Sequence, residues 1–213
     1  MKKLRILSLV LAFTMLFSTL AFAQTSKKPT KTYKDGKYYG KLLKGKRSGV
    51  GKFVFNDGSV YNGSWKNDVK QGKGELKQSD GSVFTGTWSN DMMNGRVKIV
   101  YLDGSTFDGN FVNDAADGQG IMKSAAGTYD GLFQNGFKCG QGTFTWTTGE
   151  KYVGGWANDL MEGQGVYTWP TGTKYEGAWV ADKMHGLGKM TFADGTIQEG
   201  KWENDEYVGP VSR

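Results

Sequence analysis

The sequence predicts an all-β protein, an elongated single-layer, solenoid-like meander of stacked β-hairpins with about seven and a half 23-residue repeats. A segment of the form aromatic-x-Gly-x-aromatic recurs, first as YNGSW from Tyr61 and then as FTGTW from Phe84. A polar loop, usually Gly-x-Gly, alternating apolar residues and a glycine turn follow each copy. A fixed period of this length indicates a repeat array, and alternation of apolar residues indicates strands.

The repeats cover nearly all of the chain beyond residue 37. Their first residues are 23 positions apart, except for the 22 that separate Phe107 from Tyr129. The predicted array is 38–213, with units at 38–60, 61–83, 84–106, 107–128, 129–151, 152–174 and 175–197 and a partial unit at 198–209. Each unit is predicted to form one β-hairpin.

Strand alternation predicts that the aromatic residues and glycines share one face, with polar residues on the other. Trp146 and Trp169 lie at even spacing from the paired glycines of their own strands, so all seven tryptophans can point the same way. The predicted structural face comprises Tyr61, Gly63, Trp65, Phe84, Gly86, Trp88, Tyr152, Gly154, Trp156, Tyr175, Gly177, Trp179, Trp202, Trp146 and Trp169.

The turn between strands decides whether this face is continuous. Asp57-Gly58 resembles a two-residue type I′ turn, but such a turn would send Tyr61 to the other face. Pro170 precedes the equivalent glycine, Gly172, and proline cannot adopt the positive φ that a type I′ turn needs. We therefore expect a three-residue turn with a G1 bulge and a positive φ at Gly172.

The same turn suggests a register in which rings face glycines. Pairing Phe55 with Tyr61 would place Phe53 opposite Gly63, and Gly51 opposite Trp65. A ring could then lie over bare backbone, and rings of neighbouring repeats could stack. The aromatic residues are therefore interpreted mainly as contacts between repeats.

This pattern resembles the MORN repeat, the membrane occupation and recognition nexus, in an exported bacterial type of protein. The segment from Met184 to Gly188, MHGLG, looks like the family's His-Gly-x-Gly, which makes His185 a structural loop residue. The resemblance implies an elongated, twisted sheet of hairpins that acts as a scaffold or binding surface.

Two repeats depart from the pattern. Repeat three has Val97 where a second glycine is expected, so the ring of Trp88 is expected to be displaced. Repeat four is one residue short after Gly127 and has Phe111 in place of tryptophan. We expect any bend or opening of the array there.

The N-terminal segment predicts export. A basic start and an apolar run from Ile6 to Phe22 precede small residues at a cleavage site, so residues 1–23 are predicted to be a signal peptide. An uncleaved membrane anchor is the alternative. Residues 24–37 are predicted to be a basic disordered tail. The expected location is periplasmic or extracellular, with membrane association as a further option.

The charge is divided between the two halves of the exported chain. Residues 24–106 hold 16 basic and 7 acidic residues, a net of +9, whereas residues 107–213 hold 8 and 14, a net of −6. Export and the acidic second half argue against nucleic acid as a partner. The two halves are expected to face different partners, or each other.

No residue pattern indicates an enzyme. The single cysteine, Cys139, has no neighbouring base in sequence, and no glycine loop leads into a helix. The Asn-Asp pairs supply one carboxylate per loop, too few for calcium, and suit turns. We therefore predict no catalytic residue, no metal site, no cofactor and no small-molecule substrate.

Three binding functions are open. The first is a protein partner at an apolar edge of the loops between strands, with adaptable methionines: Val69, Met92, Met93, Phe137, Leu160, Met161 and Met184. The second is an anionic lipid or envelope polyanion on basic side chains of the polar face: Lys52, Lys73, Lys77, Arg96 and Lys98. The third is cell-wall glycan, stacked on exposed tryptophans.

Overall fold

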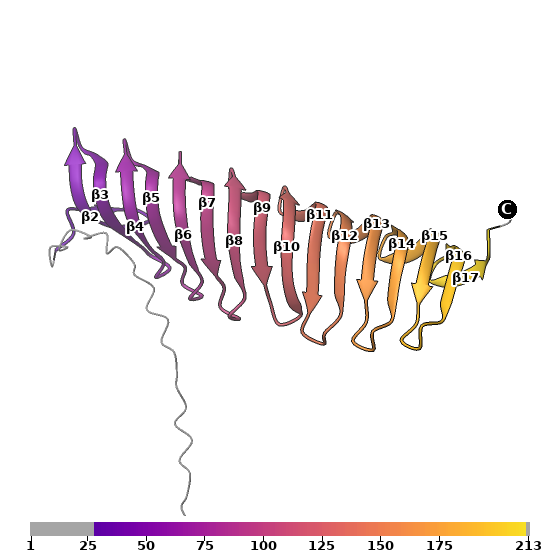
Figure 1. The fold of residues 1–213 in the computed structure, drawn as a ribbon. Coiled ribbons are helices and arrows are strands. Elements are labelled where there is room, and N and C mark those ends of the chain that lie inside the picture. The colour runs from indigo at the N-terminus through magenta and orange to yellow at the C-terminus, as the bar shows by residue number, and fades with distance from the viewer. Residues whose placement is uncertain (1–27, 212–213) are drawn as a thin grey trace, which may run out of the picture.

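The computed structural model describes residues 28–211, which form one open antiparallel sheet of 17 strands without a helix (Figure 1). Each strand pairs with the next one along the chain, so the topology is a simple meander. The predicted fold class is confirmed. The strands are β1 Lys31–Tyr33, β2 Gly36–Leu43, β3 Lys46–Phe55, β4 Val60–Lys66, β5 Val69–Lys77, β6 Val83–Ser89, β7 Met92–Val100, β8 Thr106–Val112, β9 Ala115–Lys123, β10 Gly127–Gln134, β11 Phe137–Trp146, β12 Lys151–Ala157, β13 Leu160–Thr168, β14 Lys174–Val180, β15 Lys183–Thr191, β16 Ile197–Glu203 and β17 Glu206–Gly209.

From β3 onward, the turns at the lower edge of Figure 1 have three residues, except for the two-residue turn Ala125–Ala126 between β9 and β10. Phe55 N–H donates to the Ser59 carbonyl at 2.9 Å, and Gly58 N–H donates to the Phe55 carbonyl at 3.1 Å. Gly58 has φ +92°, and Gly172, the equivalent glycine, has φ +90°. This is the expected type I turn with a G1 bulge, so the prediction for Gly172 is confirmed.

The turns at the upper edge have two residues, where the sequence suggested a longer polar loop. Asn67 and Asp68 both have positive φ, 53° and 74°, which defines a type I′ turn. The Asn-Asp pairs are thus turn residues, as expected. The apolar residues that follow them lie in strands.

The predicted strand register is wrong by two residues. Phe53, not Phe55, lies opposite Tyr61, and Gly51 lies opposite Gly63. A three-residue turn closes on Phe55 and Ser59, which leaves no room for the longer loop that the predicted pairing implied. Face assignment is unaffected, because a shift of two residues preserves it.

The glycines therefore face one another, and the tyrosine rings cover them. A Cβ added at Gly154 would lie 2.5 Å from Tyr152 Oη and 2.6 Å from the Gly165 Cα of the paired strand. Glycine is required at these positions because the ring and the neighbouring backbone already occupy the space. The register shifts just beyond these glycines, for instance between Gly154 and Trp156, which marks a bulge.

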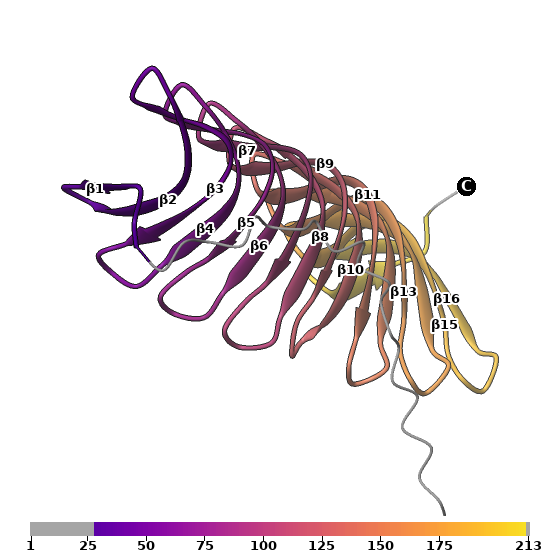
Figure 2. The same cartoon turned by 90° about the vertical axis from the view of Figure 1, so that its left-hand side faces the viewer.

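The hairpins are arched, and their stack forms a curved trough (Figure 2). Rings fill the aromatic face: Tyr61 is fully buried and lies 5.1 Å from the ring of Trp65 and 5.3 Å from that of Trp88 in edge-on contacts. The same arrangement joins Tyr152 to Trp156 and Trp179. Each tyrosine thus bridges its own repeat and the next.

Short strands close both ends of the sheet. The expected disorder of residues 24–37 is wrong for the part that the structure describes, because Lys31–Tyr33 forms β1 and β2 begins at Gly36. The Tyr33 ring packs 5.9 Å from Phe53, which explains the order. Residues 24–27 and the predicted signal peptide lie outside the described residues.

The two irregular repeats leave the sheet continuous. β9 and β10 pair without a register shift. The indole N–H of Trp88 is buried and has no hydrogen-bond partner within residues 28–211, whereas that of Trp65 donates to the Gly51 carbonyl at 3.1 Å. The expected displacement of the Trp88 ring is not seen, because it lies 5.3 Å from the Tyr61 ring in the same edge-on contact that joins Trp156 to Tyr129 at 5.3 Å. Within the described residues, no helix is long and apolar enough to cross a membrane.

Candidate binding surfaces

The aromatic face is closed. Five tryptophans of the repeat motif are 4–6% exposed: Trp65, Trp88, Trp156, Trp179 and Trp202. Trp146 and Trp169 are half-buried within the same clusters. The expectation of exposed tryptophans that could stack on sugar rings is therefore wrong for the five motif residues, because neighbouring rings and side chains cover them.

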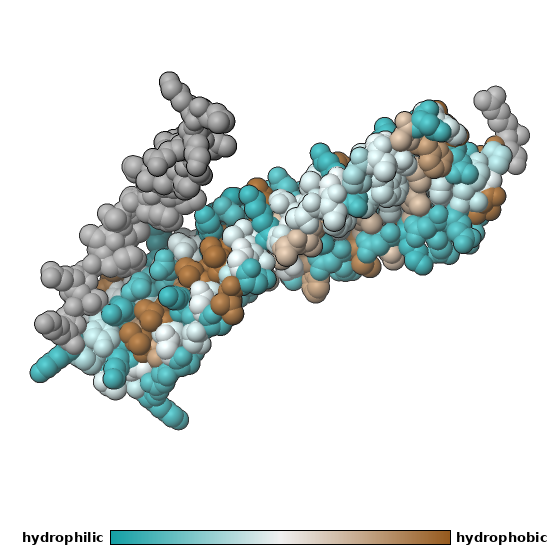
Figure 3. Space-filling view, turned by 90° about the horizontal axis from the view of Figure 1, so that it is seen from below, coloured by the Kyte–Doolittle hydropathy of each residue, from teal (hydrophilic) through white to brown (hydrophobic). Residues whose placement is uncertain are grey.

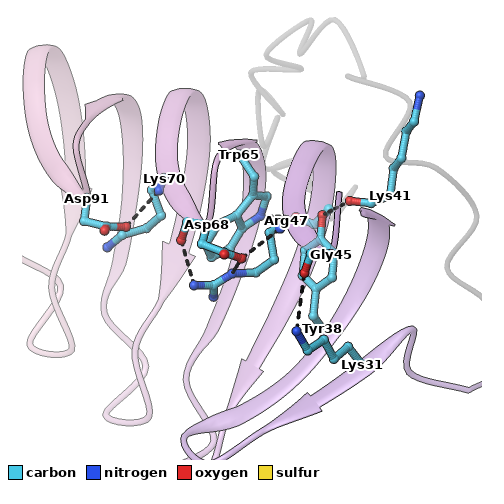
Figure 4. Close-up of polar contacts among 10 residues, drawn as sticks. Lys31, Tyr38, Lys41, Gly45, Arg47, Trp65, Asp68, Lys70 and Asp91 are labelled. Atoms are coloured by element: carbon cyan, nitrogen blue, oxygen red, sulfur yellow. Dashed lines mark hydrogen bonds and ion pairs between the residues drawn. The ribbon is translucent and has the colours of Figure 1, made fainter. Parts of the chain in front are cut away.

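Side chains from the second residue after each upper turn form this cover. The Arg47 guanidinium lies 4.2 Å from the ring centre of Trp65 (Figure 4). The ammonium groups of Lys70 and Lys138 lie 4.1 and 4.5 Å from the ring centres of Trp88 and Trp156. Burial lowers the pKa of both lysines. All three cations thus contact tryptophan rings of the array itself through cation–π interactions.

A hydrogen bond between neighbouring hairpins positions each cover residue. The Arg47 backbone N–H donates to Asp68 Oδ1 at 2.8 Å, and the guanidinium adds an ion pair to the same oxygen at 3.3 Å (Figure 4). The backbone hydrogen bond is the main reason that the pKa of Asp68 is lowered. Lys138 N–H and Met161 N–H bond in the same way to Asp159 and Asp182.

The Asn-Asp carboxylates are therefore committed to the backbone. No cluster of three His, Cys, Asp or Glu side chains that could hold a metal ion exists among residues 28–211. Cys139 lies in β11, and burial raises the pKa of its thiol, which disfavours the reactive thiolate. His185 lies within β15 and not in a loop.

The predicted apolar loop edge divides between the two faces. Met93 packs into the aromatic clusters, and Met161 and Met184 are buried there. The first residue after each upper turn points to the opposite face, because side chains alternate along a strand. Four of the predicted residues hold this position, namely Val69, Met92, Phe137 and Leu160. A single edge that gathers all seven residues does not exist.

On the opposite face, exposed apolar side chains line the upper edge of the second half. We call Val112, Phe137, Leu160 and Val180 the apolar row; their exposed fractions are 51%, 50%, 41% and 47%. The lower edge, seen in Figure 3, carries hydrophobic residues in separate groups among hydrophilic ones. Sequence reasoning missed Val112 and Val180, which directly precede their turns and signal the row only once the turn is known to have two residues.

A groove of about 530 Å³ lies below this row, across β11 to β16. Its floor is backbone at the paired glycines, such as Gly165 and Gly188. Its walls are side chains of the opposite face: Gln141, Val153, Gln164, Val166, Glu176, Leu187, Lys189 and Glu199, with Val211 at one end. The available sequence signal was the small residues Gly155 and Ala178 in the YVGGW and YEGAW motifs, where earlier repeats have Ser64 and Thr87.

The predicted basic residues lie on the opposite face of the first half. Lys52, Lys73 and Lys98 alternate with ring-face positions in β3, β5 and β7, as do Lys77 and Arg96. Arg96 forms an ion pair with Asp108 at 2.7 Å, and the Lys52 ammonium lies 4.8 Å from the ring centre of Tyr39. Lys73 and Lys77 are exposed.

Seven tandem matches to the model of the MORN repeat cover residues 38–60, 61–83, 84–106, 107–128, 129–151, 152–174 and 175–197. The chain belongs to the MORN repeat family. The matched units coincide with the seven complete repeats that the sequence predicted. No curated protein matches the chain.

Solved structures that match part of the chain include two domains in complex with peptides. One is the SAS-4 (dCPAP) TCP domain of Drosophila melanogaster in complex with a proline rich motif of Ana2 (dSTIL), at 10% identity and a TM-score of 0.44, covering 72% of this chain and 85% of that one. Another is the TCP10 domain of Danio rerio CPAP in complex with a peptide of STIL, at 13% identity and a TM-score of 0.35, covering 81% and 98%. These identities are too low to transfer residue roles to the MORN array.

Proposed function

We propose that this MORN protein is a non-catalytic scaffold of the cell envelope, and that a protein partner docks on the opposite face of its second half. The observation that carries the proposal is the apolar row together with the groove below it. Its members Phe137, Leu160 and Val180 gather on β11 to β14, about 14 Å at the usual strand spacing, and such a group of exposed apolar side chains is uncommon on a surface that meets only water.

The packing supports this choice of face. The rings, the cover residues and the turn carboxylates already contact one another on the aromatic face, so that face has few groups left for a partner. The two edges of the sheet are short strands flanked by Pro29 and Pro210, which limits strand addition. The envelope location rests on the predicted signal peptide.

The experiment compares two variants of the full chain in affinity capture from a membrane and periplasm extract. Replacement of Phe137, Leu160 and Val180 by serine is expected to abolish capture of the partner that the parent retains. Leu102→Ser removes an apolar side chain that is 72% exposed at the lower edge, and is expected to leave capture unchanged. Each captured protein is then purified and titrated against the parent and both variants. Equal affinity for the triple variant would contradict the proposal.

The second candidate function is attachment of the first half to an anionic lipid or polyanion. Its support is the net charge of +9 in residues 24–106 and the exposed Lys73 and Lys77. Binding to anionic vesicles is expected to fall steeply as salt rises. Replacement of Lys73, Lys77, Arg96 and Lys98 by glutamate is expected to abolish co-sedimentation with vesicles. Equal co-sedimentation of this variant and the parent would refute lipid attachment.

A further inference from the structure

The groove repeats with the array. Gln141, Gln164 and Leu187 hold the same position in β11, β13 and β15, each one residue before a glycine that pairs with a glycine of the next strand. Consecutive members of this set are two strands apart, about 9.6 Å at a strand spacing of about 4.8 Å. A ligand that lies along the groove therefore meets an equivalent wall at intervals of about 9.6 Å.

Among regular peptide conformations, polyproline II matches this interval. It rises about 3.1 Å per residue with three residues per turn, so every third residue points the same way at intervals of about 9.3 Å. An α-helix advances about 6.4 residues over 9.6 Å, and its contact face rotates by about 80° per repeat. An extended strand advances about 2.9 residues, but its side chains alternate, so each third residue points away.

The groove walls also offer hydrogen-bond donors. The carbonyls of a polyproline II backbone make no internal hydrogen bonds and can accept from such donors. Within residues 28–211, the side-chain amides of Gln141 and Gln164 make no hydrogen bond, whereas the equivalent Gln119 donates to Asp130 at 2.9 Å. Val153, Val166 and Leu187 supply apolar contacts beside these amides.

The charges at the groove favour a basic residue at one end of the ligand. The Glu176 carboxylate lies 2.8 Å from the Lys174 ammonium and 4.0 Å from that of Lys189. Glu199, on β16, forms no ion pair among residues 28–211. A lysine or arginine at the end that lies over β16 would complement this carboxylate.

We propose that the groove binds a proline-rich segment of the partner protein in the polyproline II conformation, running along the array with one anchor residue per MORN repeat. From β11 to β16 the groove spans about 24 Å, which accommodates about eight residues at about 3.1 Å each. The proposal rests on the proposed function, because it names the kind of protein segment that this face receives.

The test measures fluorescence anisotropy of labelled peptides titrated with the full chain. The probe is PPLPPLPPLPPK, which has leucine at every third position. One control peptide has the same composition with its leucines adjacent, and a second is an alanine-rich helical peptide with the same leucines and lysine. We expect the probe to bind at least about tenfold more tightly than either control. Equal binding of the clustered peptide, or tighter binding of the helical one, would overturn the proposal.

Two matched variants test whether the probe binds in the groove. Leu187→Asp adds a charge to an exposed side chain of the groove wall and is expected to weaken probe binding by about tenfold or more. Val50→Asp makes the same change at the equivalent position of repeat one, outside the groove, and is expected to have no effect. Equal losses in both variants would overturn the assignment. If the probe fails to bind while the apolar row is still needed for capture, the polyproline inference alone fails.

Discussion

The two halves of the array solve the same packing problem with different side chains. Towards the N-terminal end, Arg47 and Lys70 cover tryptophans with cations, whereas Met161 and Met184 hold the cover position towards the C-terminal end. The change is gradual, because Met93 holds this position in the first half and Lys138 in the second. The opposite face changes in parallel. Lys73 in β5 corresponds to Gln164 in β13, and Lys52 in β3 corresponds to Val166. The repeat therefore constrains rings, glycines and turns, and leaves the cover and the opposite face free to vary.

If the glycine-ring contact is common to both halves, the same substitution should be severe in each. Gly63→Ala and Gly154→Ala place a Cβ 2.7 and 2.6 Å from the Cα of the paired glycine. We expect each to lower the free energy of unfolding by about 3 kcal/mol, because neither the backbone nor the ring can move away. Urea titration followed by circular dichroism measures the change.

Gly58→Asn is the control for these glycines. Gly58 has positive φ, but no atom lies within 4 Å of an added Cβ, and asparagine tolerates this conformation. A loss below about 1 kcal/mol is expected. Losses of this small size at Gly63 or Gly154 would show that the ring does not require the glycine.

The stability of the array should depend on alkaline pH, because most repeats bury a tyrosine that repeats three and four lack. Burial raises the pKa of Tyr175 to about 12, and it also raises those of Tyr61 and Tyr152, whereas Phe84 and Phe107 hold this position in repeats three and four. A phenol whose pKa is higher in the folded state stabilises the protein fully below the unfolded pKa of about 10, and that stability is lost as the pH rises towards 12.

The melting temperature is therefore expected to fall between pH 10 and 12. Tyr175→Phe should make the melting temperature fall less steeply with pH, because it removes one of the phenols whose pKa is raised. The buried Lys70 and Lys138 act in the opposite direction, since their lowered pKa values make stability rise with pH. An unchanged slope in the tyrosine variant would contradict the assignment to buried phenols.

The tryptophans should differ in how much their indole N–H contributes to the free energy of unfolding. Trp156 donates to the Gly142 carbonyl at 3.2 Å, whereas the N–H of Trp88 is buried without a partner within residues 28–211. Trp156→Phe is expected to cost about 1 kcal/mol more than Trp88→Phe, because it alone breaks a hydrogen bond and leaves the carbonyl unpaired. Equal costs in chemical denaturation would show that Trp88 finds a partner in solution.

The smallest expected effect on stability is at Gly136, in the upper turn that contacts repeat four. Gly136 stands where every other upper turn except the first, which has Gly45, carries aspartate. Its N–H donates to the Ala116 carbonyl at 2.8 Å, as the aspartate N–H groups do to the carbonyls of their cover residues. Gly136→Asp adds a carboxylate that can accept the Ala116 N–H. We expect a gain of about 0.5 kcal/mol and a slightly higher melting temperature. A clear loss of stability would mean that the backbone there differs from the other turns.

The periodicity of the sequence was sufficient to predict the architecture. The period located the repeats, alternation assigned Tyr61 and Trp65 to one face, and Pro170 selected the lower turn. The register was missed because it depends on which pair closes that turn, and the patterns Phe53–Tyr61 and Phe55–Tyr61 obey the same alternation.

The candidate surfaces were harder to predict than the fold. Arg47 and Lys70 look like solvated cations in the sequence, but the arch brings each over a ring of the next repeat. Met93 and Met161 looked like loop tips, because a type I′ turn of two residues was not expected there. The groove is formed by several strands together, so no single repeat shows it, although Gly155 and Ala178 are small where earlier repeats have Ser64 and Thr87.

The central claim is that the aromatic face stabilises the array and the opposite face of the second half is free for binding. Thermal unfolding of a variant with Val112, Phe137, Leu160 and Val180 all replaced by serine tests it most directly. Because these side chains are 41–51% exposed, the account predicts a melting temperature within about 3 °C of the parent and an unchanged circular dichroism spectrum. A fall of about 10 °C or more would contradict the claim, since the apolar row would then hold the fold together.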